Sequence, residues 1–158
     1  EWIADLPPLK AGEQCNTVPN HRAANLSIKN LQRIHATPPG GGRLDWPAEL
    51  VLACHAGHTG HTDVYGRLRM DQPASALTTR CISLSNGRFG HPIQDRALSV
   101  REAASLQTFT RTFQFSGSLN SMARQIGNAV PMLLAQRLGE CFVRCAESYY
   151  EGRSRGHI

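Results

Sequence analysis

Proline and glycine interrupt the first third of this sequence so often that long regular elements are excluded there. The interruptions are Pro7, Pro8, Pro19, Pro38, Pro39 and the three glycines at 40–42. Because proline removes a backbone donor and glycine favours turns, residues 1–50 are expected to form loops. One short helix fits between about Ser27 and His35, since Leu31 and Ile34 have helical spacing and Ser27 is a suitable N-cap.

The middle of the chain has the composition of short strands. Val51–Cys54, Val64–Leu68 and Ala76–Leu84 are rich in β-forming residues, and the last segment alternates along its length. A Gly- and His-rich loop separates the first two segments, and Asn86-Gly87 is a turn signal after the third. These patterns predict three strands between residues 51 and 90.

From residue 98 the apolar spacing becomes helical. Ser99 and Glu102 form a capping-box pattern at the start of a helix that reaches about Thr108. A longer helix is expected from Pro131 to Gly152, with an apolar stripe at Leu134, Leu138, Cys141 or Phe142, Cys145 and Tyr149. The sequence therefore predicts an α+β fold with a small mixed β-sheet, a loop-rich N-terminal region and a helical C-terminal part.

Composition and charge narrow the class of protein. The 158 residues are 41% hydrophobic and 18% charged, which suits about one domain with a packed core. No apolar run approaches the roughly 20 residues that span a bilayer, and no leader pattern is visible in a sequence that begins at Glu1. The net charge is +5, and Arg supplies 15 of the 17 cationic residues. Arginine suits phosphates and guanine edges, although an arginine-rich proteome would explain the same bias.

Metal and cysteine chemistry receive little support. Cys54, His55, His58, His61 and Asp63 are dense in ligand types, but no second ligand group of known spacing accompanies them, so no metal site is expected. The five cysteines are odd in number and include no Cys-x-x-Cys pair, and they are expected to be small apolar residues of the core in a reducing compartment. No pairing of a cysteine with a histidine as nucleophile and base stands out, so no catalytic cysteine is expected in this chain.

The most informative segment is 124–131, with the sequence RQIGNAVP. From the residues alone it predicts a tight turn at Gly127, with positive φ, that leads into a helix and presents backbone amides and the Asn128 carboxamide. An ordinary capped turn would carry the same pattern.

This segment resembles motif X of the DNA cytosine-5 methyltransferases, and other blocks of that family appear in the same order. Residues 101–109, REAASLQTF, resemble motif IX. The segments 65–67, 71–73, 77–79 and 87–92 are similar in style to the family's target-recognition region, and 3–7 resembles the stretch after motif VIII. The resemblance covers nearly the whole chain.

The resemblance implies methyl transfer from S-adenosylmethionine to C5 of a cytosine that is flipped out of double-stranded DNA. The family's Pro-Cys nucleophile motif, Glu-Asn-Val motif, Phe-x-Gly-x-Gly cofactor loop and Gln-x-Arg-x-Arg block do not occur in this sequence. The chain is therefore expected to be the C-terminal portion, inactive alone, whose helical part would pack on a Rossmann-like cofactor domain elsewhere. Its expected regions are target recognition at 1–97, motif IX with its connection at 98–121, and motif X with the C-terminal helix at 122–158.

The resemblance also implies site residues. Asn128 matches the motif X asparagine that lines the cofactor pocket, and the same wall would be shaped by Gly127, Ala129 and Val130. Thr78 matches a threonine that touches the DNA backbone near the flipped base, with Thr79 beside it. Arg101 and Glu102 match motif IX and are expected to support the recognition region, with Glu102 capping and pairing. By position, the loop 57–63 would enter the DNA grooves and contact bases through His58, Thr59 and His61, with Arg67 and Arg69 reading guanine from behind it.

Three functional readings remain open at this stage. The chain is a DNA-recognition part of one methyltransferase, a free-standing DNA-binding or regulatory module, or an assembly subunit of a split enzyme. The expected partners are double-stranded DNA and an N-terminal catalytic half or catalytic subunit, with no membrane and with self-association through the C-terminal helix as a further option. The expected setting is a bacterial restriction–modification system in the cytoplasm, at the nucleoid.

Overall fold

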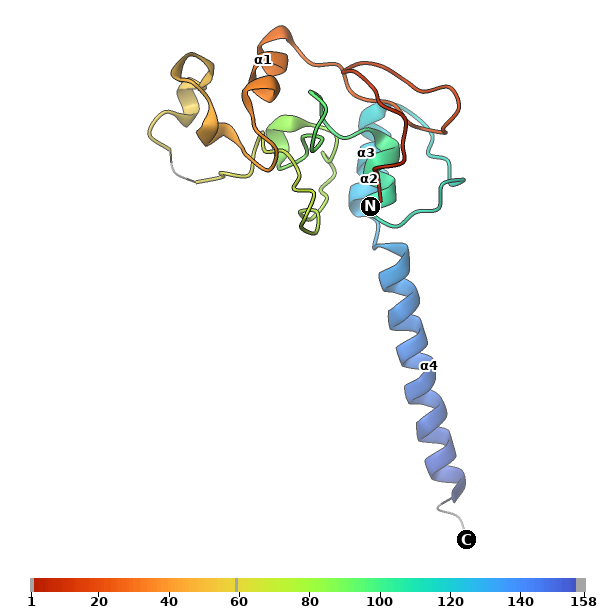
Figure 1. The fold of residues 1–158 in the computed structure, drawn as a ribbon. Helices are drawn as coiled ribbons and strands as arrows, with labels where there is room; N and C mark the ends of the chain where they lie inside the picture. The colour runs from red at the N-terminus through yellow and green to blue at the C-terminus, as the bar shows by residue number, and fades with distance from the viewer. Residues whose placement is uncertain (1, 59, 156–158) are drawn as a thin grey trace.

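Helices supply the regular structure in the computed structural model, which describes residues 2–58 and 60–155. They are α1 (Ile28–Ala36), α2 (Val100–Leu106), α3 (Leu119–Asn128) and α4 (Met132–Arg155). Short 3₁₀ turns lie between them at η1 (Arg43–Asp45), η2 (Ala48–Leu50), η3 (Ala53–His55) and η4 (Leu84–Asn86). Figure 1 shows α2 and α3 side by side in a body made largely of loops, while α4 projects from that body as a single rod.

The predicted β-sheet is wrong: the described residues form no strand, because turns interrupt each of the strand-like segments. Val51–Cys54 runs into the 3₁₀ turn η3. In Val64–Leu68, Tyr65 is left-handed with φ 61°, and the following amide of Gly66 bonds to the Asp63 carbonyl at 3.1 Å. An α+β class with a small sheet is therefore not supported.

The third predicted strand, Ala76–Leu84, is also a series of turns. The Thr78 carbonyl accepts from the Cys81 amide at 3.0 Å, and the Thr78 hydroxyl accepts from the Arg80 amide at 3.2 Å. Threonine offers the backbone such local bonds as an alternative to a ladder. Cys81, Ile82 and Leu84 of this segment are buried in the core from turns instead of from a pleated strand.

Isolated bridges are the extended pairing that remains in the described ranges. Gly90 pairs with Arg67 in parallel and with Ala97 in antiparallel orientation, and Gln14 pairs with Arg22. Position 90 requires a residue without a side chain, because a Cβ there would lie 2.9 Å from the Gly66 carbonyl oxygen. Three chain segments thus lie side by side at this point without forming a sheet.

Two of the predicted helices form as expected, and one helix was not predicted. Ser27 caps α1 by accepting from the Asn30 amide at 3.3 Å. The capping box of α2 is confirmed: the Ser99 hydroxyl accepts from the Glu102 amide at 3.1 Å, and the Glu102 carboxylate accepts from the Ser99 amide at 2.7 Å. Helix α3 occupies the segment that was expected to end in a Gly-Asn turn.

Among the described residues, buried apolar side chains form two core clusters. The larger one lies where α2 and α3 meet and contains Cys81, Ile82, Phe89, Val100, Ala103, Ala104, Phe115, Met122, Ala123 and Ile126. The smaller one lies under α1 and contains Ile34, Trp46, Tyr65, Leu84 and Ala97. Both clusters belong to the body, so the region before α4 has a core of its own.

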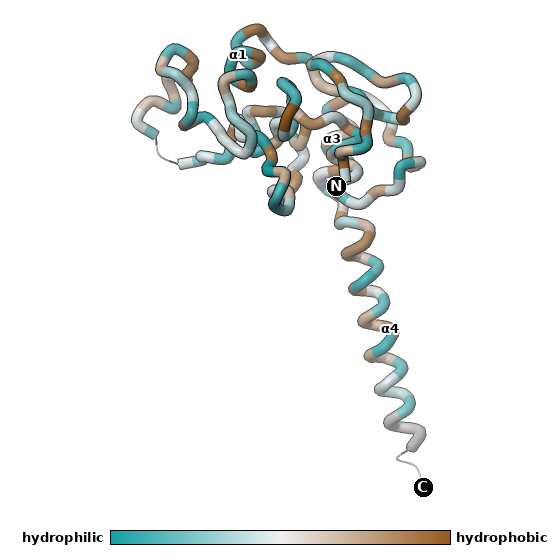
Figure 2. The backbone as a smooth tube through the Cα atoms, in the orientation of Figure 1, coloured by the Kyte–Doolittle hydropathy of each residue, from teal (hydrophilic) through white to brown (hydrophobic). Residues whose placement is uncertain are grey.

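No side chain of helix α4 that the structure describes belongs to that core. Its predicted start is confirmed, but it continues past Gly152 to Arg155. Leu134, Leu138 and Phe142 of the predicted stripe are 49–73% exposed, and Figure 2 shows hydrophobic residues interleaved with hydrophilic ones along the helix. Cys141 and Cys145 on this helix are exposed, as is Cys54, and Cys15 is half-buried, so the expected place of the cysteines in a core is wrong for these four, whereas Cys81 is buried as expected. No helix in the described ranges is both long and apolar enough to cross a membrane.

Candidate functional site

Gly127 lies inside α3, and its close contact with another segment explains why glycine is required there. It does not have the positive φ that the sequence predicted. A Cβ atom at this position would lie 2.2 Å from both the carbonyl carbon and oxygen of Thr78 and 2.4 Å from the Thr79 nitrogen. The helix therefore lies directly against the backbone of residues 78–79, an approach that only glycine permits.

This contact joins two groups of residues that the sequence assigned to different tasks. Asn128 and Val130 follow Gly127 and are exposed, and Ala129, the C-cap of α3, is half-buried. Thr78 and Thr79, the expected DNA-backbone contacts, are exposed on the other side of the contact. The expected cofactor wall and the expected DNA contact are therefore neighbours.

The turn after α3 is held by the end of α2. The Gln107 side-chain amide donates to the carbonyls of Ile126 at 3.0 Å and Ala129 at 3.3 Å. The Gln107 carbonyl in turn accepts from the Met132 amide at 3.3 Å. One residue of the motif IX segment thus bonds both the end of α3 and the start of α4, which fixes the backbone on both sides of Asn128.

Thr108 supports the same turn from a strained conformation. Its φ is 60°, a region that β-branched residues rarely adopt. It closes α2 in a Schellman arrangement, with amide-to-carbonyl bonds Thr108–Ser105 at 2.9 Å and Phe109–Ala104 at 3.0 Å, where glycine is the usual residue. The threonine hydroxyl accepts from the Leu133 amide at 3.0 Å in the first turn of α4. Threonine in this strained conformation therefore supplies a side-chain acceptor for the Leu133 amide, which glycine would lack.

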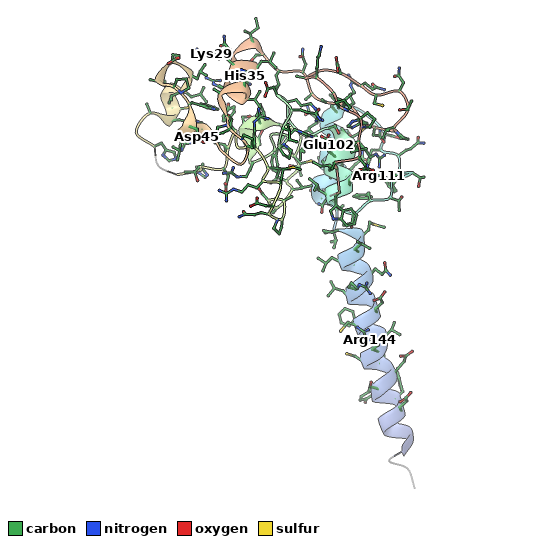
Figure 3. All side chains as sticks on the ribbon, viewed as in Figure 1. Lys29, His35, Asp45, Glu102, Arg111 and Arg144 are labelled. Atoms are coloured by element: carbon green, nitrogen blue, oxygen red, sulfur yellow. The ribbon has the colours of Figure 1, made fainter. Side chains whose placement is uncertain are left out.

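A fully buried ion pair anchors the start of α2. Arg96 donates to both carboxylate oxygens of Glu102 at 2.7 and 2.6 Å, and both side chains are at most 1% exposed. Burial acts to raise the pKa of Glu102, but Arg96 and the Ser99 amide more than offset it, so the net pKa is lowered. Figure 3 shows Glu102 within the body, far from Arg144 on α4. Glu102 is committed to holding the fold.

His91 borders this ion pair and is neutral at ordinary pH. Its Nδ1 accepts from the amides of Ile93 at 3.2 Å and Gln94 at 2.9 Å, and its Nε2 lies 3.7 Å from the Glu102 carboxylate. Burial lowers the pKa of His91 to about 4, with Glu102 opposing the shift and nearby arginines adding to it.

Arg101 likewise bonds only to the protein itself. The buried guanidinium donates to the carbonyls of Pro19 at 2.8 Å, Thr110 at 3.0 Å and Phe113. These acceptors lie on the N-terminal loops and on the connection between α2 and α3. Arg101 therefore ties three parts of the body together, the kind of contact that a supporting role requires.

The structure does not leave Arg67 free to contact DNA. The side chain is 3% exposed, and its five N–H groups donate to the carbonyls of Ile34, Thr37, His91 and Gln94 and to the Asp95 carboxylate. A guanidinium has five N–H donors, so no donor is left for guanine. The expectation that Arg67 reads a base is therefore corrected: the residue joins α1 to the segment 91–95.

The His-rich loop is exposed and lies apart from Thr78. His58 and His61 are stacked with ring centroids 5.9 Å apart, and buried Arg43 donates to the carbonyls of His58, Gly60 and His61. Figure 1 shows the chain near residue 60, in yellow, at the opposite end of the body from α3. Thr59 lies outside the described residues. In the described ranges, no three His, Cys, Asp or Glu side chains are grouped to hold a metal ion.

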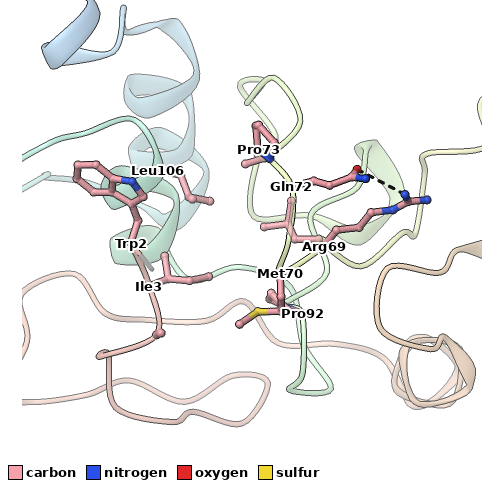
Figure 4. A pocket seen from close by; sticks show the side chains of 11 residues that line it. Trp2, Ile3, Arg69, Met70, Gln72, Pro73, Pro92 and Leu106 are labelled. Atoms are coloured by element: carbon pink, nitrogen blue, oxygen red, sulfur yellow. Dashed lines mark hydrogen bonds between the residues drawn. The ribbon is translucent and has the colours of Figure 1, made fainter.

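Arg69 is exposed beside an apolar pocket that Figure 4 shows from close by. Its Nη1 donates to the Gln72 side chain at 3.4 Å. The pocket is lined by Trp2, Ile3, Leu68, Met70, Pro73 and Leu106, among others. Arg69 retains free donors at the surface, unlike Arg67.

The chain matches the family of C-5 cytosine-specific DNA methylases over residues 13–144. It belongs to this family. It is 47% identical over 137 residues to the Type II methylase M.HgiDII of Herpetosiphon aurantiacus, covering 83% of this chain and 39% of that protein. It is 35% identical over 142 residues to the Type II methyltransferase M1.HphI of Haemophilus parahaemolyticus, covering 90% of this chain and 35% of that protein. A DNA (cytosine-5)-methyltransferase 3 of Arabidopsis thaliana is 32% identical over 87% of the chain.

The match covers only part of the length of these relatives. The chain spans about two fifths or less of the length of these relatives. Within this methylase chain, sequence reasoning missed the supporting roles of Gln107, Thr108, Arg96 and Arg43. The one signal in the sequence was that polar Gln107 and Thr108 directly follow Leu106, the last apolar residue of α2. Polar side chains at such a position can cap a neighbouring helix.

Proposed function

We propose that this chain is the DNA-recognition and cofactor-pocket-completing part of a DNA (cytosine-5) methyltransferase. The complete enzyme would transfer a methyl group from S-adenosylmethionine to C5 of cytosine in double-stranded DNA. The chain alone would be inactive, since the family's Pro-Cys and Glu-Asn-Val motifs do not occur in its sequence. Cys81 is unsuited to attack a base, because burial raises the pKa of its thiol to about 11.

The observation that carries this proposal is the close contact between Gly127 and the backbone of Thr78 and Thr79. It supports a site in which a cofactor wall and a DNA contact share one boundary. A methyl donor and its target carbon must lie within reach of each other, so the two sites must adjoin.

The residues after Gly127 fit one wall of a cofactor pocket. Asn128 offers a carboxamide that can donate and accept, and Val130 offers exposed apolar surface beside it. Ligand pockets combine apolar walls with a few placed polar groups. Bound S-adenosylmethionine would supply the methyl group; the role of this chain would be to orient the donor through Asn128, with Ala129 shaping the turn.

The DNA contacts would come from two exposed places. Thr78 and Thr79 would bind the backbone near the target base, since hydroxyls suit phosphate contacts. His58, Thr59 and His61 of the loop 57–63, together with Arg69, would contribute to base readout. Arg67 is left out of this set because its donors are used within the fold.

The exposed helix α4 supports a partner. We propose that its apolar residues pack on an N-terminal catalytic half or a separate catalytic subunit, with self-association through α4 when that partner is lacking. We further propose a bacterial restriction–modification setting in the cytoplasm, at the nucleoid, since two relatives are named as Type II enzymes of bacteria.

Fluorescence anisotropy of the 158-residue chain on labelled duplexes tests the proposal. We expect binding that weakens steeply with salt and that ranks several cytosine-containing sequences differently. The double variant His58→Ala, His61→Ala should lose the ranking and keep the salt slope, whereas Lys29→Ala on α1 should keep the ranking. Binding that ignores both salt and sequence would contradict recognition by this chain.

A further inference from the structure

Two arginines from separate segments meet at one polar pocket on the surface of the body. Arg80 comes from the turns after residue 76, and Arg124 comes from α3. The pocket is otherwise lined by hydroxyl and amide side chains, those of Thr79, Ser118, Asn120 and Ser121. No carboxylate lines it, so its charge is positive.

These two arginines differ from most others in the body. Arg33, Arg43, Arg67, Arg88, Arg96 and Arg101 all donate from their guanidinium groups to carbonyls or carboxylates of the protein. Within the described ranges, Arg80 and Arg124 make no salt bridge and their guanidinium groups make no hydrogen bond. Two unpaired positive charges at one pocket favour an anion there.

A buried contact fixes the two segments against each other. Cys81 follows Arg80 and Ala123 precedes Arg124, and the Cys81 thiol lies 3.7 Å from the Ala123 carbonyl oxygen in the core. The approach of Gly127 to Thr78 sets the same two segments in register one turn further along α3. The spacing of the arginines is therefore built into the fold, which a recognition site needs.

We propose that Arg80 and Arg124 together bind one phosphate of the DNA backbone, with Thr79 and Ser121 as hydroxyl donors at its edge. Guanidinium groups match phosphate oxygens with paired N–H donors, and such contacts set the register of a protein on a duplex. This inference rests on the proposed function, because it takes the ligand to be DNA. It adds a positioning contact directly beside Thr78 and Thr79.

The test compares Arg80→Gln, Arg124→Gln and the double variant with Arg144→Gln, which removes the same charge from exposed α4. In duplex anisotropy, each single pocket variant should weaken binding about tenfold, and the double variant should reduce the salt slope by about 1. Each single variant should lose less slope than the double variant, since both arginines contact one phosphate and one arginine remains. The ranking of sequences should not change, and Arg144→Gln should match the parent chain. Pocket variants that bind like Arg144→Gln would overturn the proposal.

A second arm separates the site from the function. Inorganic phosphate titrated into ¹⁵N-labelled chain should shift the amide signals of Thr79, Arg80 and Ser121, and the double variant should abolish the shifts. If the parent chain bound no duplex at all, the proposed function and the DNA assignment would both fail, and local phosphate shifts would then identify an anion site of another kind. Absence of shifts in a chain that binds DNA would overturn the pocket alone.

Discussion

Helices α2 and α4 of this chain are opposites in how they are stabilised. Six of the seven residues of α2 are buried, and Glu102 in its first turn forms a buried ion pair with Arg96, which precedes the helix. Helix α4 has 24 residues, yet its side chains that are described are exposed except for half-buried Glu140. Its links to the body are the bonds of Met132 and Leu133 to Gln107 and Thr108.

The difference indicates that the body has a core of its own, while the described side chains of α4 have almost no tertiary packing. Most helical stability in proteins comes from tertiary packing, and an isolated helix in water is marginal. A short helix packed on all sides is therefore firmer than a long one that touches the protein at one end.

Breaking the buried ion pair should affect the body far more than breaking an exposed one. Arg96→Met leaves Glu102 charged and unpaired at 1% exposure, so the free energy of unfolding should fall by about 3–5 kcal/mol. Arg137→Met removes the exposed pair with Glu140 on α4 and should cost about 0.5 kcal/mol or less. Urea denaturation followed by the fluorescence of buried Trp46 measures both. Equal losses would mean that the body is not held by this pair.

Acid should destabilise the body through His91. Its pKa is about 4 in the fold and 6.5 unfolded, so the unfolded state binds the extra proton first and stability falls as pH drops from about 6.5 to 4. The loss should be about 2–3 kcal/mol over that window. The lowered pKa values of Glu102 and Asp95 act in the same direction as their folded pKa values are approached.

The variant His91→Asn separates these contributions. It keeps a side-chain acceptor for the Ile93 and Gln94 amides but does not titrate, so its stability should vary less between pH 6.5 and 4 than that of the parent chain. Urea midpoints at half-unit steps of pH measure the difference. Parallel curves for the two proteins would exclude His91 as the main acid-sensitive group.

A glycine-to-alanine substitution can be compared between the body, at Gly127, and α4, at Gly139. Gly127→Ala places a methyl group 2.2 Å from backbone atoms of Thr78, so it should cost about 1–3 kcal/mol and shift the segment 78–81. Gly139→Ala in α4 meets nothing within 4 Å and should increase helicity, worth about 0.5–1 kcal/mol to the helix. Thermal unfolding and circular dichroism report the two effects. If Gly127→Ala left the stability unchanged, the close contact between the Asn128 turn and Thr78 would not be rigid.

Local capping signals predicted part of this fold, and long-range hydrogen bonds decided the rest. The starts of α1 and α2 followed from Ser27 and Ser99, because a cap is set by residues three positions apart. The sheet was mispredicted because alternation in Ala76–Leu84 looks the same whether Thr78 bonds across a ladder or to Cys81. Helix α3 was missed because a Gly-Asn pair normally indicates a turn, whereas here the glycine serves a close contact.

The candidate site shows the same division. Asn128 and Thr78 could be selected by matching motifs, and the fold brings their segments together at Gly127. The burial of Arg67 could not be foreseen, since arginines are usually solvated and its acceptors come from residues 34–95. The roles of Gln107 and Thr108 depend on carbonyls and amides 19 to 25 residues away, which no local pattern encodes.

Hydrogen exchange of the isolated 158-residue chain tests the division most directly. Amides within α2, such as those of Ala103 and Ala104, should exchange only through unfolding of the whole body. Amides in the middle of α4, such as those of Phe142 and Val143, should exchange at least about 100-fold faster, because a solvent-exposed helix opens locally. Equal protection of α2 and the middle of α4 in the monomeric chain would contradict the account.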